Sequence, residues 1–458
     1  MDPEAIRHAT QARVDIEREK YAPAPEAEPG KIDDAEPIIT SEEIIDSAYK
    51  DEDGNAFLYI KCHTGKFLYD RASCDWYYWQ EHHWALDVLG NNMRGIAQEV
   101  IPRYTSEASR QAWNRAKAEQ QNNEDLAKKH EKSERACLRQ ARKLHNISRK
   151  RNVLELAGTG NNSLGIRGDE WDRDPMVLGV KNGVVDLSTS TLRPGRPEDL
   201  IKTVSPVEYQ GPNMPCPVFS KTLHEIFSDC VPIIEYFQRL CGYCLTGLTD
   251  EHVFAILWGS GRNGKSLLLS IITYILGDHA GEVEAEFIMK QRFGRHSGGP
   301  TSDIMAMQGK RLIVASESPD GAQLNAGRVK WTTGGDRLTG RAVYGKRQVS
   351  FSPTHKLWLL TNHRPHIDPG DYALIKRLHL IPFQRAFVEN PDPAKGESKA
   401  DPRLFDKMKV ESSGILAWMV RGCLEWQRQG LNPPNEVRAA VESYVQEEDV
   451  IKLFLDEV

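Results

Sequence analysis

The stretch Gly259-Ser-Gly-Arg-Asn-Gly-Lys-Ser266 decides the fold of the chain, because it has the pattern G-x-x-x-x-G-K-S of a phosphate-binding loop. The apolar run Val253–Trp258 before it is typical of a buried strand, and Ser266–Leu276 after it is typical of a buried helix that ends at Gly277. Strand, loop and helix together direct backbone N–H groups and a helix N-terminus towards one anion. A glycine turn that only joins a strand to a helix is the alternative, and the complete motif in this context argues against it.

The loop predicts a site for a nucleotide and Mg²⁺. Lys265 is expected to reach the β- and γ-phosphates, and the hydroxyl of Ser266 is expected to be a ligand of Mg²⁺. The expected nucleotide-binding set is the loop itself: Gly259, Ser260, Gly261, Arg262, Asn263, Gly264, Lys265 and Ser266.

Two further strands end in polar residues that suit the same chemistry. Arg311–Ser316 is an apolar strand followed by Glu317, where a carboxylate can hold Mg²⁺ and polarise the attacking water. The strand His355–Asn362 ends in Asn362, which could hydrogen-bond the γ-phosphate or the lytic water. The alternatives are an incidental surface glutamate and an asparagine that starts a turn.

Composition limits the class of protein. The chain has 458 residues, of which 40% are hydrophobic, which is enough for two to four domains with proper cores. No apolar stretch approaches the roughly 20 residues of a membrane span, and the N-terminus lacks the pattern of a signal peptide. Eight cysteines without a secretion signal favour a reducing cytoplasm.

Charge is distributed unevenly. Residues 286–385 hold 16 Lys and Arg against 7 Asp and Glu, a net charge of +9. Because the whole chain has a net charge of −6, the remaining residues carry −6 − 9 = −15. A second basic cluster, Lys128–Arg151, holds ten Lys and Arg against Glu131 and Glu134. This cluster could face DNA, although a solvated helix face is the more common explanation of such a run.

The N-terminal part divides into three segments. Residues 1–37 have the composition of a disordered leader. In residues 38–100, the aromatic runs Ala56–Lys61, Lys66–Asp70 and Trp76–Trp79 are expected to be strands. Their aromatic side chains could stack on bases, but the core of a small sheet is the favoured explanation. Residues 104–157, charged and nearly free of glycine and proline, are expected to be helical.

The middle of the chain shows a hairpin and two helices. Val177–Val180 and Val184–Leu187 flank Asn182-Gly183, which predicts a β-hairpin. Gly211–Pro217 is the predicted boundary, and helices are expected at Val218–Ser228 and Val231–Leu245. The Cys241-Gly-Tyr-Cys244 sequence is expected to pack one helix face rather than bind zinc, because no second pair lies nearby.

Basic residues follow the acidic strand. Lys330 precedes Thr332–Asp336, and Arg341–Phe351 is predicted to be a hairpin with its turn at Gly345-Lys346. Such a basic tip suits a phosphate backbone, although lysine also serves solubility on exposed hairpins. Ile375–Phe383 is a fourth expected strand with Arg377 at its entry, where it could act on a neighbouring subunit's nucleotide. Residues 404–458 are expected to form amphipathic helices, and the pattern stops without a helix-stop signal, which suggests a missing C-terminal domain.

Taken in series, these motifs resemble the superfamily 3 helicase domain of phage, plasmid and poxvirus-type primase-helicases. The resemblance runs from Val253 to about Phe387, and the segments 175–250 and 404–458 look like those that flank the domain in phage members. It rests on the phosphate loop, Lys310–Glu317, Lys330 with Thr333–Asp336, Lys356–Asn362 with Pro365, and Arg377–Phe383.

The resemblance implies an ATP-driven ring, usually a hexamer, that moves along DNA with 3′→5′ polarity. It makes Lys265 and Ser266 ligands of ATP and Mg²⁺, Glu317 the acidic residue, Asn362 the sensor and Arg377 the arginine finger. If an Arg377→Ala variant hydrolysed ATP normally, Lys376, Arg364 and Arg385 would be the other candidates for the finger. Lys330, Arg341 and the hairpin tip at Lys346 and Arg347 would face DNA in the channel. Viral initiators of this superfamily often have two adjacent acidic residues at this motif, but here Ser316 precedes Glu317, so Asp320 is a candidate second ligand.

The expected fold class is therefore α/β, with a P-loop AAA+-like core, a small α+β N-terminal domain and flanking helical segments. The expected divisions are a leader at 1–37, an N-terminal domain at 38–210, a helical collar at 211–250, the ATPase domain at 251–390 and a helical region at 391–458. The expected localisation is the cytoplasm of a bacterial host.

The predicted function is a replicative DNA helicase of a phage or mobile element, with a primase or polymerase as a possible partner. No primase motif is found in the first 250 residues, so no primase activity is expected. Two alternatives stay open: another ring ATPase, such as a packaging motor, and a nucleotide-switched protein that binds a replication origin.

Overall fold

The computed structural model describes residues 38–160, 162–291, 301–317, 320–341, 348–392, 394 and 396–457, with side chains up to residue 449. The predicted leader, residues 1–37, and the hairpin tip at 342–347 lie outside the described residues. Contacts divide the described chain into an N-terminal unit, residues 38–173 with 196–202, and a C-terminal unit, residues 174–195 with 203–457. The predicted boundary at Gly211–Pro217 differs from this division, which begins the C-terminal unit at Asp174.

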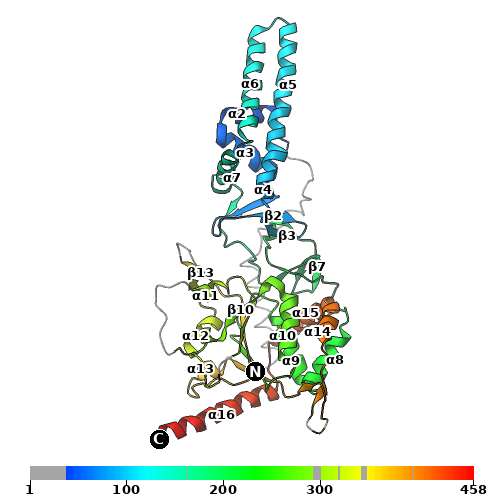
Figure 1. Ribbon diagram of the computed structural model, residues 1–458, viewed down its shortest axis with the longest axis vertical. Helices are drawn as coiled ribbons and strands as arrows, with labels where there is room; N and C mark the ends of the chain where they lie inside the picture. The colour runs from blue at the N-terminus through cyan, green and yellow to red at the C-terminus, as the bar shows by residue number, and fades with distance from the viewer. Residues whose placement is uncertain are drawn as a thin grey trace. The chain divides into compact units, whose positions relative to one another are not determined.

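The N-terminal unit combines helices with a small sheet (Figure 1). The sheet has the strand order β3-β2-β1-β4. Its strands are β1 (Phe67–Asp70), β2 (Asp75–Gln80), β3 (His83–Leu86) and β4 (Gly165–Ile166). Its helices are α2 (Ser41–Tyr49), α3 (Asp51–His63), α4 (Asn91–Gly95), α5 (Ile101–Gln120), α6 (Glu124–Lys143) and α7 (Ile147–Thr159), with one π-helical turn (Ile96–Val100) before α5.

The strand predicted at Ala56–Lys61 is wrong, because these residues lie inside α3. Asn55, Tyr59 and Cys62 are buried at helical spacing, and the helix begins with three consecutive acidic residues, which the N-terminal end of a helix dipole favours. The strands predicted over the other two aromatic runs are confirmed as β1 and β2.

Aromatic side chains of this sheet serve the core. Trp84 is 2% exposed and donates its indole N–H to the carbonyl of Pro197 at 2.9 Å. Tyr77, Trp84 and Trp171 form one buried cluster, and Trp76 and Trp79 are half-buried. The structure therefore favours the core over a base-stacking platform.

Helices α5 and α6 pack against each other as an antiparallel hairpin (Figure 1). Together with α7 they confirm the helical prediction for residues 104–157. Small side chains, including Ala108, Ala136 and Cys137, are buried in the core that these helices share with α2, α3 and α7. Asn123 begins α6 by accepting a hydrogen bond from the backbone N–H of Leu126.

The C-terminal unit begins with a second small sheet of order β7-β6-β5-β8. Its strands are β5 (Val177–Val180), β6 (Gly183–Asp186), β7 (Thr191–Arg193) and β8 (Val204–Ser205). The hairpin predicted around Asn182-Gly183 is confirmed, because β5 and β6 pair antiparallel with Val180 opposite Gly183.

The main sheet has five parallel strands in the order β10-β11-β14-β9-β15, which confirms the α/β class. They are β9 (Phe254–Trp258), β10 (Ala280–Glu284), β11 (Leu312–Ser316), β14 (Lys356–Thr361) and β15 (Leu378–Pro382). In β9, Ala255 and Leu257 belong to one core, and Phe254 and Ile256 belong to another. A strand that is apolar throughout is what burial on both faces of a parallel sheet requires.

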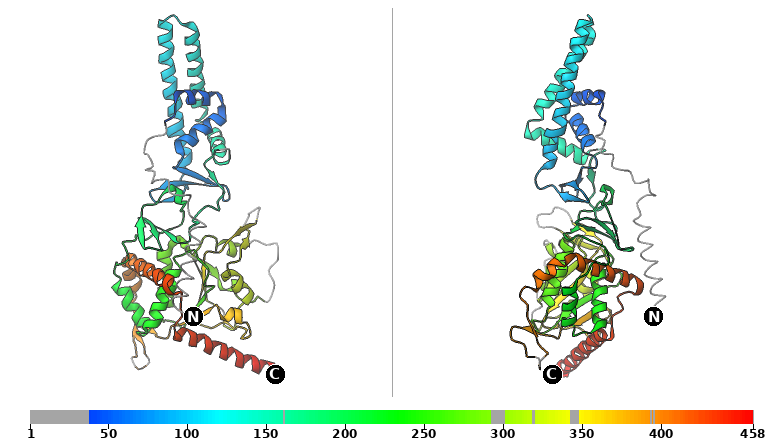
Figure 2. Two further views of the ribbon diagram at one scale, coloured as in Figure 1. Left: turned by 180° about the vertical axis from the view of Figure 1, so that it is seen from behind. Right: turned by 90° about the vertical axis from the view of Figure 1, so that its right-hand side faces the viewer.

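Helices cover both faces of this sheet (Figures 1 and 2). One face carries α8 (Pro217–Ile226), α9 (Val231–Tyr243), α10 (Lys265–Leu276), α14 (Leu404–Val410) and α15 (Ser412–Gln429). The other carries α11 (Ser302–Met305), α12 (Ala326–Thr333), α13 (Tyr372–Ile375) and α16 (Asn435–Glu457). The helices predicted before the loop and in the tail are thus confirmed.

Short elements complete the unit. The strands β12 (Leu338–Gly340) and β13 (Val349–Phe351) pair antiparallel. Of the hairpin predicted at Arg341–Phe351, the structure places β13 inside the predicted range and β12 just before it, and the predicted turn lies outside the described residues. The strands β16 (Phe387–Val388) and β17 (Ser398–Lys399) form a second pair. Cys241 and Cys244 are fully buried in the core of the α10 face, and the described residues contain no group of three or more His, Cys, Asp or Glu side chains that could hold a metal ion. Among the described helices, none has the length and apolarity to cross a membrane.

Candidate nucleotide-binding site

Three adjacent strands bring the predicted residues to one edge of the main sheet. In the parallel register, Ser316 of β11 lies opposite Leu360 of β14, and Thr361 of β14 lies opposite Trp258 of β9. Glu317, Asn362 and Gly259 follow these strands, so they share the carboxyl edge of the sheet, where parallel α/β sheets bind ligands.

A cavity of about 380 Å³ lies at this edge, within the size range of small-molecule sites. Its wall combines the phosphate loop with the ends of β11 and β14 and with one aromatic residue beyond β15. The lining residues are Gly261, Arg262, Asn263, Gly264, Lys265, Ser266, Leu267, Glu317, Leu360, Thr361, Asn362 and Phe387.

Lys265 is the charged centre of this cavity. Its side chain is almost inaccessible, at 4% exposure, and burial lowers its pKa to about 8. Its Nζ donates to the carbonyl of Gly259 at 2.6 Å and to Oδ1 of both Asn263 and Asn362 at 3.0 Å. These partners hold the ammonium group among oxygen atoms, which is the environment that phosphate oxygens would also supply.

The loop adopts a backbone that needs glycine. Gly261 has φ +98°, Arg262 +51° and Gly264 +83°, all in the left-handed region. A Cβ atom on Gly264 would lie 2.6 Å from Cδ1 of Ile226, so this position also needs the absence of a side chain. Helix α10 begins directly after Gly264, and its N-terminal N–H groups therefore face the cavity.

Asn263 ties the loop to the neighbouring strand. Its Nδ2 donates to the carbonyl of Phe383 at 3.0 Å while its Oδ1 accepts from Lys265. The sequence indicated Asn263 as a member of the loop but not this bridging role, because Phe383 lies 120 residues away.

Glu317 and Ser266 provide the oxygen donors for a metal ion. Both line the cavity and both are exposed to it, and hydroxyl and carboxylate oxygens are the ligands that Mg²⁺ prefers. Glu317 has φ +58°, a strained conformation for a residue other than glycine, and its N–H donates to the carbonyl of Leu360 at 2.9 Å. Asp320 lies outside the cavity lining, and its carboxylate is 3.5 Å from Nδ1 of His363.

Arg377 lies at the opposite edge of the sheet. It precedes β15, which runs parallel to β9, and its carbonyl accepts from the N–H of Phe254 at 2.7 Å at the start of β9. The five residues of β9 separate it from the loop, about 17 Å along the strand. Its Nη1 donates to the carbonyl of Ala373 at 2.6 Å, and Nε is buried without a hydrogen bond among the described residues.

The residues predicted to face DNA are only partly described. Lys330 pairs with Asp371 at 2.8 Å, and this hydrogen bond is the main reason that the pKa of Asp371 is lowered. The backbone N–H of Arg341 donates to the hydroxyl of Thr301 at 2.8 Å. Lys346 and Arg347 lie outside the described residues.

Phe387 is a cavity residue that no motif indicated. Its ring forms part of the wall, and its N–H donates to the carbonyl of Arg262 at 2.7 Å, which fixes it against the loop. It lies more than 100 residues from the loop, and a lone aromatic beyond a strand carries no signal in the sequence.

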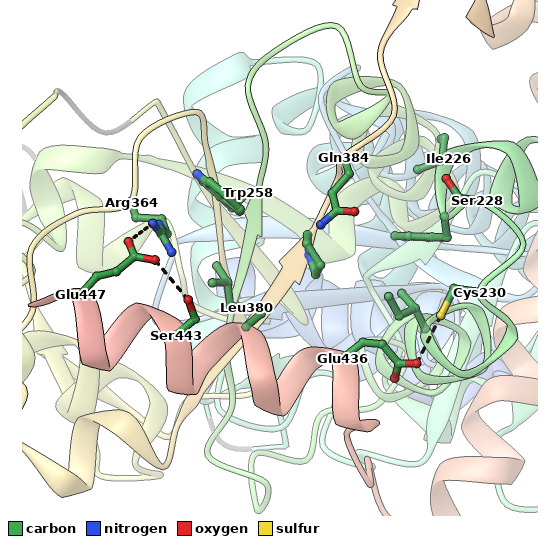
Figure 3. A pocket seen from close by; sticks show the side chains of 14 residues that line it. Ile226, Ser228, Cys230, Trp258, Arg364, Leu380, Gln384, Glu436, Ser443 and Glu447 are labelled. Atoms are coloured by element: carbon green, nitrogen blue, oxygen red, sulfur yellow. Dashed lines mark hydrogen bonds and ion pairs between the residues drawn. The ribbon is translucent and has the colours of Figure 1, made fainter. Parts of the chain in front are cut away.

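A second cavity, of about 470 Å³, lies between the ends of β9 and β15, the α8–α9 connection and α16 (Figure 3). Arg364 lies over the ring of Trp258 at 4.6 Å and over that of Tyr444 at 5.3 Å, and it pairs with Glu447 of α16. Cys230 lies 3.6 Å from a carboxylate oxygen of Glu436. Arg364, one of the alternative fingers, therefore anchors α16 to its own subunit.

The comparisons with known proteins connect this chain to viral replication proteins. Residues 56–228 match the family described as "D5 N terminal like". "Putative helicase L207/L206" of Acanthamoeba polyphaga mimivirus is 27% identical over 85% of this chain and 41% of the relative. "Putative helicase 184R" of Invertebrate iridescent virus 6 is 30% identical over 52% of this chain and 25% of the relative.

A "Putative primase C962R" of African swine fever virus is 24% identical over 62% of this chain and 31% of the relative. The chain thus spans between a quarter and about two fifths of the length of these three relatives. All three are proteins of large viruses, and none of the three comes from a bacterial virus, so they give the predicted bacterial host no support.

One solved structure, the apo form of the NrS-1 C-terminal region, aligns with 64% of this chain and 65% of its own, at 14% identity and a TM-score of 0.41. A TM-score at this level does not establish a common overall fold.

Proposed function

We propose that this chain, a relative of the D5-like primase-helicases of large DNA viruses, is an ATP-dependent DNA helicase motor. The observation that carries the proposal is the meeting of Lys265, Asn362 and Glu317 around one cavity at the ends of adjacent parallel strands. A phosphate loop with a carboxylate and an amide beyond it supplies the parts that ATP hydrolysis requires.

Each residue takes a role that its position supports. Lys265 and the N–H groups of the loop hold the β- and γ-phosphates, while Ser266 and Glu317 hold Mg²⁺, which would neutralise the charge of the phosphates. Asn362 lies beside Lys265 and positions the attacking water. The remaining loop residues, Gly259, Ser260, Gly261, Arg262, Asn263 and Gly264, shape the cradle.

Arg377 acts in trans. It lies at the edge of the sheet opposite its own loop, so it can contact a nucleotide only across a subunit border. This supports an AAA+-like ring with nucleotides at the borders, and the hexamer and the 3′→5′ direction follow from the resemblance of the motifs. Lys330, Arg341, Lys346 and Arg347 are the proposed DNA contacts in the channel, and a primase or polymerase is the proposed partner.

The decisive experiment measures ATP hydrolysis with and without single-stranded DNA, together with displacement of a strand from forked duplexes with a 3′ or a 5′ loading tail. The Lys265→Ala variant is the matched control. Stimulated hydrolysis with displacement from the 3′-tailed fork alone is the expected result. Hydrolysis that DNA does not stimulate would point to another kind of ring ATPase, and tight ATP binding without turnover would point to a nucleotide switch.

A further inference from the structure

Helix α6 of the N-terminal unit carries a row of five basic residues on one face. Lys128, Lys132, Arg135, Arg139 and Arg142 follow one another at spacings of four and three residues, and all five are exposed. This spacing places them on one face of a helix over about 21 Å. The row is called the basic stripe below.

The stripe is opposite to the face that packs. The buried side chains of α6, such as Ala127, Ala136 and Gln140, face α5 and α2, and Gln140 donates to the carbonyl of Ala48 in α2 at 3.1 Å. The stripe therefore faces away from the helices that α6 packs against, at the outer surface of the α5–α6 hairpin.

Few carboxylates compensate this charge. Within the unit, Lys128 pairs with Glu124 at 3.6 Å, and Arg135 pairs with Glu131. No ion pair with a carboxylate is found for Lys132, Arg139 or Arg142 among the described residues. Solvated helix faces usually alternate the sign of their charges, whereas neighbours in this stripe repel one another, because like charges three or four residues apart destabilise a helix. A polyanion would relieve that repulsion.

The chemistry of the stripe favours nucleic acid over a membrane surface. A helix that lies on a membrane needs a free apolar face, and the apolar face of α6 is buried. The stripe also contains no aromatic residue on which unpaired bases could stack. Phosphates at the regular positions of a duplex match a straight row of cations best.

We propose that the basic stripe of α6 binds double-stranded DNA through its phosphates, without regard to sequence. This site is separate from the DNA contacts proposed for the channel, and it does not depend on the proposed motor activity.

The test is fluorescence anisotropy of the full chain with a labelled 24-base-pair duplex, without nucleotide, over a range of salt concentrations. The stripe variant is Lys132→Ala/Arg139→Ala/Arg142→Ala. The matched control is Arg110→Ala/Lys117→Ala/Lys221→Ala, which removes three exposed positive charges outside the stripe. All six side chains are exposed, so both variants are expected to fold, and circular dichroism checks this.

The stripe variant is expected to bind the duplex about tenfold more weakly at 100 mM salt, with a salt dependence shallower by about 2.7 in log–log slope for three lost phosphate contacts. The control should bind like the unmodified chain. The stimulation of ATP hydrolysis by single-stranded DNA should be the same in the stripe variant as in the unmodified chain. Duplex binding thus tests the stripe and ATP hydrolysis tests the motor, so the failure of one proposal can be distinguished from the failure of the other. Equal duplex binding by the two variants would overturn the inference. Binding to vesicles that contain phosphatidylserine is measured alongside, and a stripe variant that loses vesicle binding but keeps duplex binding would also overturn it.

Discussion

The ammonium group of Lys265 lies 3.0 Å from Oδ1 of Asn362, although 97 residues separate them in the chain. This contact joins the phosphate loop after β9 to the end of β14, the neighbouring strand. A γ-phosphate bound by Lys265 would therefore lie beside the amide of Asn362, and both side chains could contact the same phosphate.

Substitution of Asn362 should separate binding from turnover. Asn362→Ala removes one of the three oxygen partners of Lys265 but leaves the loop intact, so ATP binding should change little while kcat falls about 100-fold, as loss of one positioned hydrogen-bonding group typically causes. Asn362→Asp should weaken ATP binding, because it places a carboxylate beside the phosphate. Binding measured by calorimetry and steady-state hydrolysis give both quantities. If Asn362→Ala lost binding as completely as Lys265→Ala, the amide would serve the loop and not the reaction.

Nucleotide affinity should depend on pH through Lys265. Because burial lowers its pKa to about 8, the free protein carries a charged amine below pH 8 and a neutral one above it. Phosphate binding needs the charged form, so the Kd for ATP should rise about tenfold between pH 7 and pH 9. Lys265→Ala should bind weakly throughout and show no such rise. Calorimetry in two buffers of different ionisation enthalpy should also show proton uptake on binding at pH 8.5, and its absence would assign the pH dependence to another group.

Much of the site follows from the sequence because each strand is a continuous apolar run followed by its functional residue. Parallel strands share one carboxyl edge, so Gly259, Glu317 and Asn362 had to meet there once the strands were adjacent. The strand predicted at Ala56–Lys61 is wrong because alternation and helical spacing cannot be told apart over six residues of mixed aromatic character.

Contacts between distant segments could not be predicted. Three such contacts depend on how β15 and α16 pack against the sheet. They are the hydrogen bond from Asn263 to Phe383, the hydrogen bond that fixes Phe387 against the loop, and the stacking of Arg364 on Trp258. The secondary-structure propensity of a short segment does not determine which distant segment it packs against. The ion pair between Lys330 and Asp371 is another contact between distant segments that the sequence could not predict. It gives Lys330, which the sequence predicted to face DNA, a partner within its own chain.

The Lys330–Asp371 pair allows the DNA role of Lys330 to be tested. Asp371→Asn should remove the ion pair yet keep the hydrogen bond from the N–H of Leu374 that caps α13, so the free energy of unfolding should fall by only about 0.5–1 kcal/mol. Lys330→Ala should cost the same stability and, if Lys330 also contacts DNA, reduce the stimulation of ATP hydrolysis by single-stranded DNA severalfold. Asp371→Asn serves as the matched control and should keep that stimulation. Equal stimulation in both variants would leave Lys330 a structural role alone.

Arg377 gives the sharpest test of the ring. Arg377→Ala and Lys265→Ala should each abolish hydrolysis, the first with ATP binding intact and the second without it. Because Arg377 lies at the sheet edge opposite its own loop, an intact site needs Lys265 from one subunit and Arg377 from its neighbour. Mixing the two inactive variants should therefore restore hydrolysis at borders where an Arg377→Ala subunit supplies the loop and a Lys265→Ala subunit supplies the arginine. For random hexamers from an equal mixture, about a quarter of the borders have this arrangement, so activity should peak near one quarter of that of the unmodified chain. An equal mixture that stays inactive, in rings shown by sedimentation to contain both variants, would mean that the finger is another residue or that Arg377 acts within its own subunit.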